Sequence, residues 1–175
     1  MTNLHDLLIQ RRSIRKYKPD YLKPEEVRLI LEAGLLAPTS KSSRAWHFIV
    51  VEDPQVLEQM SQCKAAGAMP IAKAPLAIVV AMDSSKDDAW IEDAAIASAY
   101  MQLQAEDLGI GSCWIEIRDR YQADGTPAQE KLEELLGIPE TMPIVSVITF
   151  GYKDEERKPQ NVEKLLWENV HISKW

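Results

Sequence analysis

Four short apolar runs, separated by helical patterns, most constrain how this chain can fold. Their sequences are HFIVV, PLAIVVAMD, SCWIEI and PIVSVITFGY, at residues 47–51, 75–83, 112–117 and 143–152. Each run is rich in β-branched residues and is bounded by polar or turn residues, which is typical of buried strands. Strands interleaved with helices, without an internal repeat or a flexible linker, predict one α+β domain.

The helical patterns have readable beginnings and ends. Pro24 suits a first helical turn and Pro38 a stop, Asp53-Pro54 provides a cap followed by a first-turn proline, and Thr126-Pro127 is expected to cap a helix that runs to Gly137. Further helices are expected over residues 4–12 and 90–108. Gly109 and Gly111 are expected to end the long helix at positive φ and to turn the chain into the next strand.

Composition limits the compartments and partners. The chain has 175 residues, enough for one compact core, and its sequence pI is about 5.0. An acidic surface argues against nucleic acids and anionic membranes as partners. Two cysteines are too few for a disulfide framework, and the first residues lack the pattern of a secretory signal, so the cytoplasm is the expected location.

A basic segment near the amino end is the strongest functional signal. The sequence QRRSIRKYKP at residues 10–19 holds five cations. Residues 1–18 therefore carry five positive charges against Asp6 alone, a balance of +4, which leaves 15 cations and 26 anions, or −11, in the rest. A positive field this local predicts a small anionic ligand rather than a polyanion.

The usual self-sufficient catalytic motifs do not occur. His5, His47 and His171 are far apart without a metal-ligand spacing, and Cys113 lies within an apolar run as a core thiol would. GIGSCW at residues 109–114 lacks the third glycine of a dinucleotide-binding turn and follows a helix instead of a strand. We therefore expect no metal site and no catalytic side chain, and a bound cofactor would carry the reaction.

Five segments in order resemble the nitroreductase family of FMN-dependent oxidoreductases. They are RRSIRKYKP (11–19), APTSKSSRAWHFIVV (37–51), DAAIASAYMQLQAEDLGIGSCWI (93–115), LLGIP (135–139) and GYKDEERKP (151–159). The resemblance covers nearly the whole chain. It implies a central, mostly antiparallel sheet flanked by helices, in an intertwined homodimer with FMN at the subunit interface.

The resemblance assigns the basic segment to the cofactor phosphate. Arg11, Arg12, Ser13 and Arg15 are the expected phosphate and ribityl contacts, because guanidinium groups give directed, charge-assisted hydrogen bonds to phosphate. Arg157 and Lys158 occupy the place of a second cationic contact, with Lys153 as a substitute. The alternative for both segments is a solvated run of surface charge.

Two further segments are implied to meet the flavin. The first is a loop that in the family reaches the neighbouring subunit's flavin, with Pro38, Thr39, Ser40, Ser42 and Arg44; here Ser42, Arg44 and Ala45 replace a common asparagine, glutamine and proline. Arg44 could stabilise reduced flavin or draw an acidic substrate, or simply pair with a surface carboxylate. Trp46 is expected to anchor the core.

The second flavin segment is the strand SCWIEI, whose main chain lies against the ring in the family. Trp114, Ile115 and Glu116 are candidates by position, although their side chains alone would be assigned to the core, with Glu116 as a salt-bridge partner.

The implied activity is ping-pong electron transfer from NAD(P)H to nitroaromatic, quinone or related small acceptors. A flavin-binding protein without efficient turnover, or a specialised reductase of the same fold, is the alternative. Residues 1–152 would form one FMN-binding domain. Residues 153–175 would be a carboxyl-terminal arm, whose large apolar residues either pack on their own subunit or cover the partner.

Overall fold

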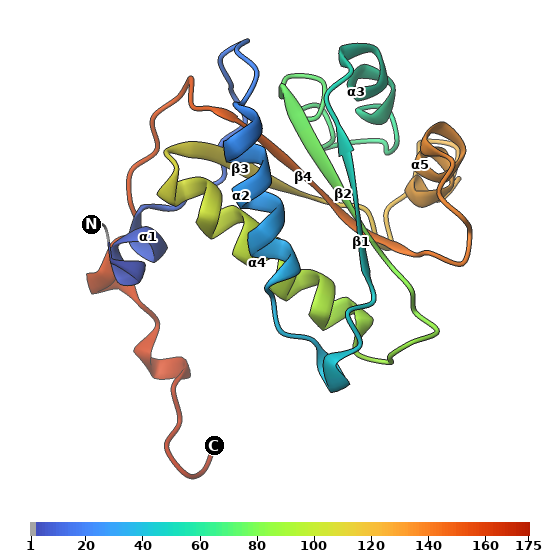
Figure 1. Cartoon of the computed structure of the whole chain (residues 1–175). Coiled ribbons are helices and arrows are strands. Elements are labelled where there is room, and N and C mark those ends of the chain that lie inside the picture. Colours follow the sequence, from blue (N-terminus) through green and yellow to red (C-terminus); the bar gives the residue numbers. More distant parts are fainter. Residues whose placement is uncertain (1–2) are drawn as a thin grey trace.

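The computed structural model, which describes residues 3–175, has one open antiparallel sheet of four strands (Figure 1). The strands are β1 (Trp46–Val51), β2 (Leu76–Met82), β3 (Ile110–Glu116) and β4 (Ile144–Tyr152), in the spatial order β1-β2-β4-β3. Each of the three neighbouring pairs is antiparallel, so the expected α+β fold with an antiparallel sheet is confirmed. β3 is an edge strand, so one of its two sides has no neighbouring strand of the sheet.

Five α-helices surround the sheet, and most begin and end where the sequence predicts. They are α1 (Leu4–Gln10), α2 (Pro24–Leu35), α3 (Pro54–Met60), α4 (Trp90–Asp107) and α5 (Ala128–Leu136). The Asp53 carboxylate accepts the amide hydrogens of Gln55 and Val56 as the cap of α3. The predicted Thr126 cap is wrong, because Pro127 is the N-cap residue of α5 and makes no side-chain bond there.

The helices cover the two faces of the sheet and give three layers (Figure 1). β2 is buried along its whole length, and its side chains alternate between two cores. Ala77, Val79 and Ala81 belong to the core that includes α3 and α5, whereas the neighbouring positions of β2 belong to the core that includes α2 and α4. Continuous burial explains why this run is apolar at every position.

The two glycines around the start of β3 have different roles. Gly109 has φ 75° and ends α4, as predicted. The same prediction for Gly111 is wrong, because this residue lies inside β3 and pairs with Gly151 of β4. A Cβ atom at Gly111 would lie 2.8 Å from two carbons of Ile14, so the position is glycine because another segment packs directly on it.

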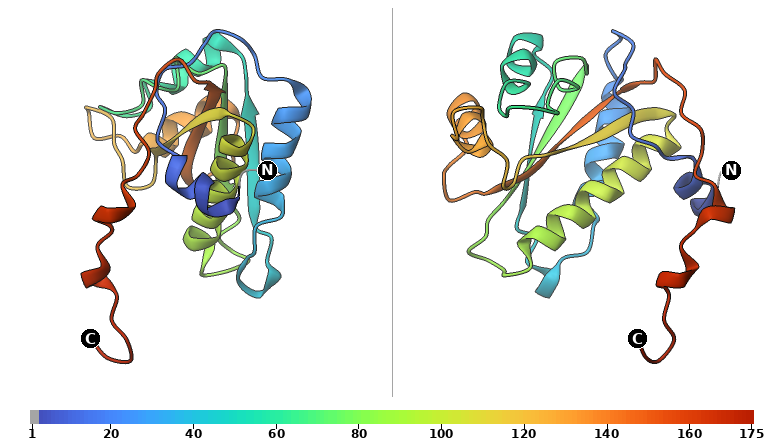
Figure 2. Two further views of the ribbon diagram at one scale, coloured as in Figure 1. Left: turned by 90° about the vertical axis from the view of Figure 1, so that its left-hand side faces the viewer. Right: turned by 180° about the vertical axis from the view of Figure 1, so that it is seen from behind.

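The carboxyl-terminal arm, residues 153–175, leaves the body of the molecule (Figure 2). Beyond Gln160, whose N–H donates to the Ile9 carbonyl, its only regular elements are the 3-10 turns η2 (Val162–Lys164) and η3 (Trp167–Asn169). All of its large apolar side chains from Val162 onward are exposed, and Trp167 is 70% exposed. The apolar residues from Val162 onward therefore do not pack on their own subunit in this structure, whereas the first residues of the arm do, and packing of the arm on a partner stays a prediction. Among residues 3–175, no helix is long and apolar enough to cross a membrane.

Candidate functional site

The backbone of the basic segment is fixed between the edge of β3 and the end of β4. The Ile14 N–H donates to the Ser112 carbonyl of β3 at 2.9 Å, and the Lys18 N–H donates to the Tyr152 carbonyl of β4 at the same distance. The Asp154 N–H in turn donates to the Lys16 carbonyl at 3.0 Å. The five cations are therefore presented by an ordered backbone and not by a free loop.

Two apolar side chains anchor this segment. Ile14 and Tyr17 are buried, and they pack over the cross-strand pair Gly111 and Gly151, where added Cβ atoms would meet them at 2.8 Å. The Tyr17 hydroxyl bonds to the Ile14 carbonyl and lies 2.7 Å from the Thr149 Oγ1. Burial raises the pKa of Tyr17 well above its ordinary value, so the phenol is neutral and serves packing.

The fold brings the basic segment to the start of the arm, 146 residues later in the chain. The Arg12 guanidinium donates a hydrogen bond to the Lys158 carbonyl. Residues of both segments line one concavity of about 760 Å³, among them Arg12, Lys153 and Arg157. Two groups of predicted phosphate contacts, Arg11 to Arg15 and Arg157 with Lys158, thus lie together, although their binding role stays a prediction.

Acidic side chains share this concavity, and two of them are neutralised by ion pairs. Lys153 Nζ lies 2.7 Å from Glu106 Oε1 at the end of α4, and Arg157 Nη2 lies 2.6 Å from Glu155 Oε2. Lys153, the predicted substitute for a phosphate contact, is therefore paired with a carboxylate. Asp154 and Glu156 complete the acidic lining.

The outer edge of β3 continues from the basic segment. The Ser112 carbonyl accepts from Ile14, and the Glu116 carbonyl accepts from Lys64 Nζ at 2.7 Å, so both groups point away from β4. Because antiparallel pairing alternates, the Trp114 main chain between them also points to the open edge. Ile115 is buried. The Trp114 Nε1–H donates to Glu116 Oε2 at 2.9 Å, and within residues 3–175 Glu116 forms no salt bridge.

The loop after α2 is held in an unusual backbone conformation. Lys41, Ser42 and Arg44 all have positive φ values, of 51°, 54° and 48°. Such residues cost free energy unless surrounding contacts determine them, and they cluster at functional sites. Arg44 forms no ion pair within residues 3–175, so the alternative of a surface carboxylate partner is not realised there.

The contact that determines this loop is Asp93, in the first turn of α4. Its carboxylate is buried and accepts the Ser40 N–H at 3.0 and 3.2 Å and the Ser43 hydroxyl at 3.3 Å. The Arg44 N–H donates to Thr39 Oγ1 at 3.2 Å. Pro38, Ser42 and Arg44 themselves are exposed.

Within one chain, the loop and the basic segment are not brought together. The loop lies at the amino end of α4, whereas the basic segment follows α1 near the other end of α4, and all views keep them apart (Figures 1 and 2). A single subunit therefore holds two separate parts of the predicted cofactor site.

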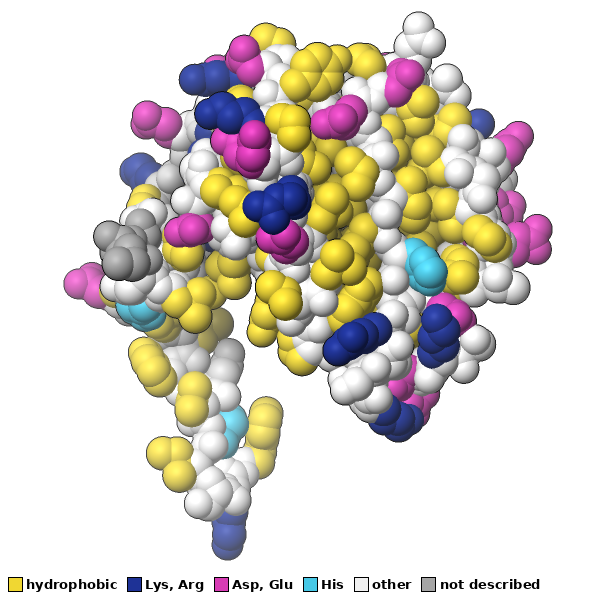
Figure 3. Space-filling model, viewed as in Figure 1, with side chains coloured by type: hydrophobic (Ala, Val, Ile, Leu, Met, Phe, Trp, Pro, Cys, Tyr) yellow, Lys and Arg dark blue, Asp and Glu magenta, His cyan; other side chains and the backbone are white. Residues whose placement is uncertain are grey.

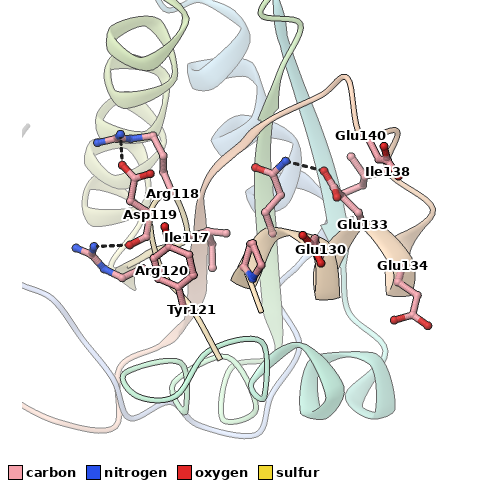
Figure 4. A pocket seen from close by; sticks show the side chains of 12 residues that line it. Ile117, Arg118, Asp119, Arg120, Tyr121, Glu130, Glu133, Glu134, Ile138 and Glu140 are labelled. Atoms are coloured by element: carbon pink, nitrogen blue, oxygen red, sulfur yellow. Dashed lines mark hydrogen bonds and ion pairs between the residues drawn. The ribbon is translucent and has the colours of Figure 1, made fainter. Parts of the chain in front are cut away.

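A second concavity, of about 870 Å³, lies between α5 and the segment after β3 (Figure 4). Arg118 pairs with Asp119 beside it, and Glu130, Glu133 and Glu134 line the opposite side. None of the predicted site residues lines it. Its larger volume does not make it the cofactor site, because Arg118 is already paired with Asp119 and the rest of the wall is rich in carboxylates, which would repel a phosphate.

Several other side chains have the positions expected from the sequence. Trp46 is buried at the start of β1, as a core anchor. Cys113 is buried, and burial raises the pKa of its thiol, which fits an inert core residue. Within residues 3–175, no group of three His, Cys, Asp or Glu side chains could hold a metal ion.

Comparison with known proteins gives a consistent result. The sequence profile of the nitroreductase family matches residues 8–152. A protein of Archaeoglobus fulgidus, with the provisional name NADH dehydrogenase/NAD(P)H nitroreductase, is 36% identical over 174 residues, 97% of each chain. A relative from Methanothermobacter thermautotrophicus with the same provisional name is 34% identical over 94% of this chain and 84% of its own.

A solved structure extends the likeness to the fold. The FMN-dependent nitroreductase of Clostridium difficile R20291 superimposes with a TM-score of 0.94 at 45% identity, over 97% of this chain and 98% of that one. The profile match, the two relatives and this structure agree with the family segments and with the three-layer fold. The chain belongs to the nitroreductase family.

Proposed function

We propose that this protein is an FMN-dependent oxidoreductase of the cytoplasm that passes electrons from NAD(P)H to nitroaromatic, quinone or related small acceptors. The observation that carries the proposal is the meeting of two cationic segments beside the open edge of β3. The 45% identity to an FMN-dependent nitroreductase over 97% of the chain supports the same cofactor. Cys63 and Cys113, both free, fit a reducing compartment.

The chemistry of the donor set fits FMN. A phosphate needs several convergent donors, and Arg11, Arg12, Ser13 and Arg15 provide guanidinium and hydroxyl hydrogens within one ordered segment. A flavin ring needs main-chain groups at its polar edge and an apolar surface, which the open edge of β3 at Trp114 to Glu116 offers. Acids in the same concavity oppose an anion, but Glu106 and Glu155 are already paired with cations.

The roles of the chain's own residues follow from this fit. When bound, FMN supplies the redox chemistry by accepting a hydride from NAD(P)H and reducing the acceptor in a ping-pong sequence. The cations of the basic segment bind and orient the phosphate. The β3 edge orients the ring through main-chain groups. Positioning of the cofactor by these groups is the contribution of the protein that we propose.

We also propose that two chains form a homodimer that completes each site. Leu4 and Leu8 of α1 and Ile96 and Tyr100 of α4 are exposed apolar residues on one subunit. Figure 3 shows further apolar side chains along the projecting arm. A helix that is apolar on several faces, as α4 is, normally lies in a core, and a second copy would provide one.

The separation of the loop from the basic segment supports the same assembly. The loop of residues 38–44 would reach the flavin held by the partner's basic segment, while the arm of residues 153–175 would cover the partner's surface. Each site would thus take Arg11 to Arg15, Arg157, Lys158 and the β3 edge from one chain and Pro38 to Arg44 from the other. Residues 1–152 would act as the FMN-binding domain.

The test begins with a visible spectrum of the purified protein supplied with FMN. We expect a protein-bound flavin spectrum, bleaching on anaerobic addition of NADH or NADPH, and recovery of colour when a nitroaromatic or quinone is added. Steady-state double-reciprocal plots at several acceptor concentrations should give parallel lines, as ping-pong kinetics require.

Two outcomes would change the proposal. Failure to bind FMN in excess would refute the cofactor assignment and everything built on it. Binding without reduction by either nicotinamide would instead favour the alternative, a flavin-binding protein without efficient turnover. A narrow acceptor range that excludes nitroaromatics and quinones would favour a specialised reductase of the same fold.

A further inference from the structure

Glu155, which follows β4, joins the two cationic segments through one carboxylate. Its Oε1 accepts the Arg15 N–H at 2.6 Å and the Lys16 N–H at 3.2 Å, and its Oε2 lies 2.6 Å from Arg157 Nη2. The side chain is only 12% exposed. All of these partners lie in the two segments that the proposed function assigns to the cofactor phosphate.

Two consecutive main-chain amides thus donate to the same carboxylate oxygen, an arrangement that stabilises the ionised form of the side chain. The amide of Arg15 is the main cause that lowers the pKa of Glu155 below its ordinary value, and Arg157 adds to the effect. The side chain is therefore an anion at neutral pH, with its charge opposed by two amide dipoles and a guanidinium.

A carboxylate in a phosphate site would normally weaken phosphate binding by repulsion. The geometry around Glu155 indicates a different effect, because its acceptor positions are already directed at fixed donors. Arg157 points to Glu155, so its guanidinium is engaged within the protein. The neighbouring Glu156 is exposed and forms no ion pair within residues 3–175. It therefore carries the same charge as Glu155 without the contacts that hold Glu155 in place.

We propose that Glu155 is a positioning residue for the phosphate end of the cofactor. It fixes the backbone at Arg15 and Lys16 against the start of the arm and takes Arg157 as its counter-ion. Arg11, Arg12 and Ser13 then provide the side-chain contacts to the phosphate, and Arg157 acts on it only through Glu155. This inference rests on the proposed function, and it changes the role that the sequence resemblance gave to Arg157.

The test compares the dissociation constants of FMN and riboflavin, which differ by the phosphate alone. For E155A we expect the FMN dissociation constant to rise roughly tenfold, because the charge-assisted hydrogen bonds that order the binding segment are lost, while the riboflavin constant changes little. E156A is the matched control, because it removes the same charge from the next residue. It should leave FMN binding unchanged or slightly tighter.

A second pair of variants keeps the test valid if E155A folds poorly. E155D keeps the charge but shortens the side chain by one methylene, so it should weaken FMN relative to riboflavin if reach matters. R157A should weaken FMN less than E155A, and the two effects should not add in the double variant, since both break one contact.

The outcomes separate the two proposals. If the wild-type protein binds no FMN, the proposed function and this inference both fail. If it binds FMN but E155A and E155D bind FMN as tightly as wild type, or lose FMN and riboflavin equally, Glu155 does not position the phosphate end and only this inference is overturned. Tighter FMN binding by E155A would identify the residue as a repulsive bystander.

Discussion

Replacing Gly111 by Ala tests whether the sheet itself holds the basic segment. The new Cβ would lie 2.8 Å from two carbons of Ile14 and 3.0 Å from Lys153 Cγ. Carbon atoms in contact normally lie about 3.5–4.0 Å apart, so Ile14 would have to move by roughly 1 Å. Such a shift would lengthen its 2.9 Å hydrogen bond to Ser112 beyond bonding range.

The expected loss follows from these two effects. Overpacking of a buried contact typically lowers stability by about 1–3 kcal/mol. Loss of the hydrogen bond costs about 1 kcal/mol, an amount that this range already includes. We therefore expect G111A to lower the free energy of unfolding in urea by about 1–3 kcal/mol. Because the displaced segment carries Arg11 to Arg15, FMN affinity should fall more than riboflavin affinity.

Gly125→Ala provides the control for a general loss of stability. Gly125 has φ 91°, and nothing lies within 4 Å of an added Cβ. The left-handed backbone should make alanine cost about 1–2 kcal/mol there, far from the basic segment. G125A should therefore lose stability with an unchanged ratio of FMN to riboflavin affinity. A G111A protein with wild-type urea midpoint and wild-type FMN affinity would refute the packing of Ile14 on β3.

Three further predictions concern the loop of residues 38–44, the loss of stability at acidic pH and the carboxyl-terminal arm. D93A should lower the free energy of unfolding by about 1–3 kcal/mol and speed amide hydrogen exchange over residues 39–44, because the Ser40 N–H and the Ser43 hydroxyl lose their acceptor; unchanged exchange there would contradict the role of Asp93. The folded-state pKa of Glu155 lies below its ordinary value of 4.5, so its contribution to stability is complete above that pH and is lost as the pH falls below it. Urea titrations from pH 6 to 3 should thus show a smaller acid-dependent loss for E155Q than for wild type, and equal slopes would argue against an ionised Glu155 in the folded state. Deleting residues 162–175 removes Leu165, Leu166 and Trp167, none of which is buried in one subunit, so light scattering should show a weaker dimer; a dimer of unchanged concentration dependence would exclude the arm from the interface.

The fold was largely predictable because its signals are local. Asp53 beside Pro54 marks a helix start by short-range hydrogen bonding, and Gly137, with φ 66°, marks a helix end by a conformation that glycine adopts easily. The continuous apolar run of β2 indicates burial on both faces. The errors are at Thr126 and Gly111, where the local pattern suits a cap or a turn but tertiary packing decides.

The candidate site was only partly predictable, because its supporting contacts are distant in sequence. The basic segment is visible as a charge cluster, and the cations at the start of the arm are visible as a second one. Glu155 lies within the mixed run KDEERKP, and Asp93 resembles an ordinary acidic residue in a first helical turn. No spacing rule indicates that these carboxylates hold residues 15 and 40. The two facing glycines, Gly111 and Gly151, weakly indicate that another segment packs on the sheet there, but their pairing is apparent only once the strand register is known.

These contacts explain how an acidic protein can keep a dense positive cluster in order. Five cations in ten residues repel one another, and repulsion alone would favour an extended, mobile segment. Buried Ile14 and Tyr17, placed between the cations, give the segment apolar anchors on a glycine surface, while main-chain bonds to β3 and β4 fix its path. Glu155 then offsets part of the repulsion at its own end. The order of the cluster is therefore set before any phosphate arrives, and preorganised donors lower the entropic cost of binding it.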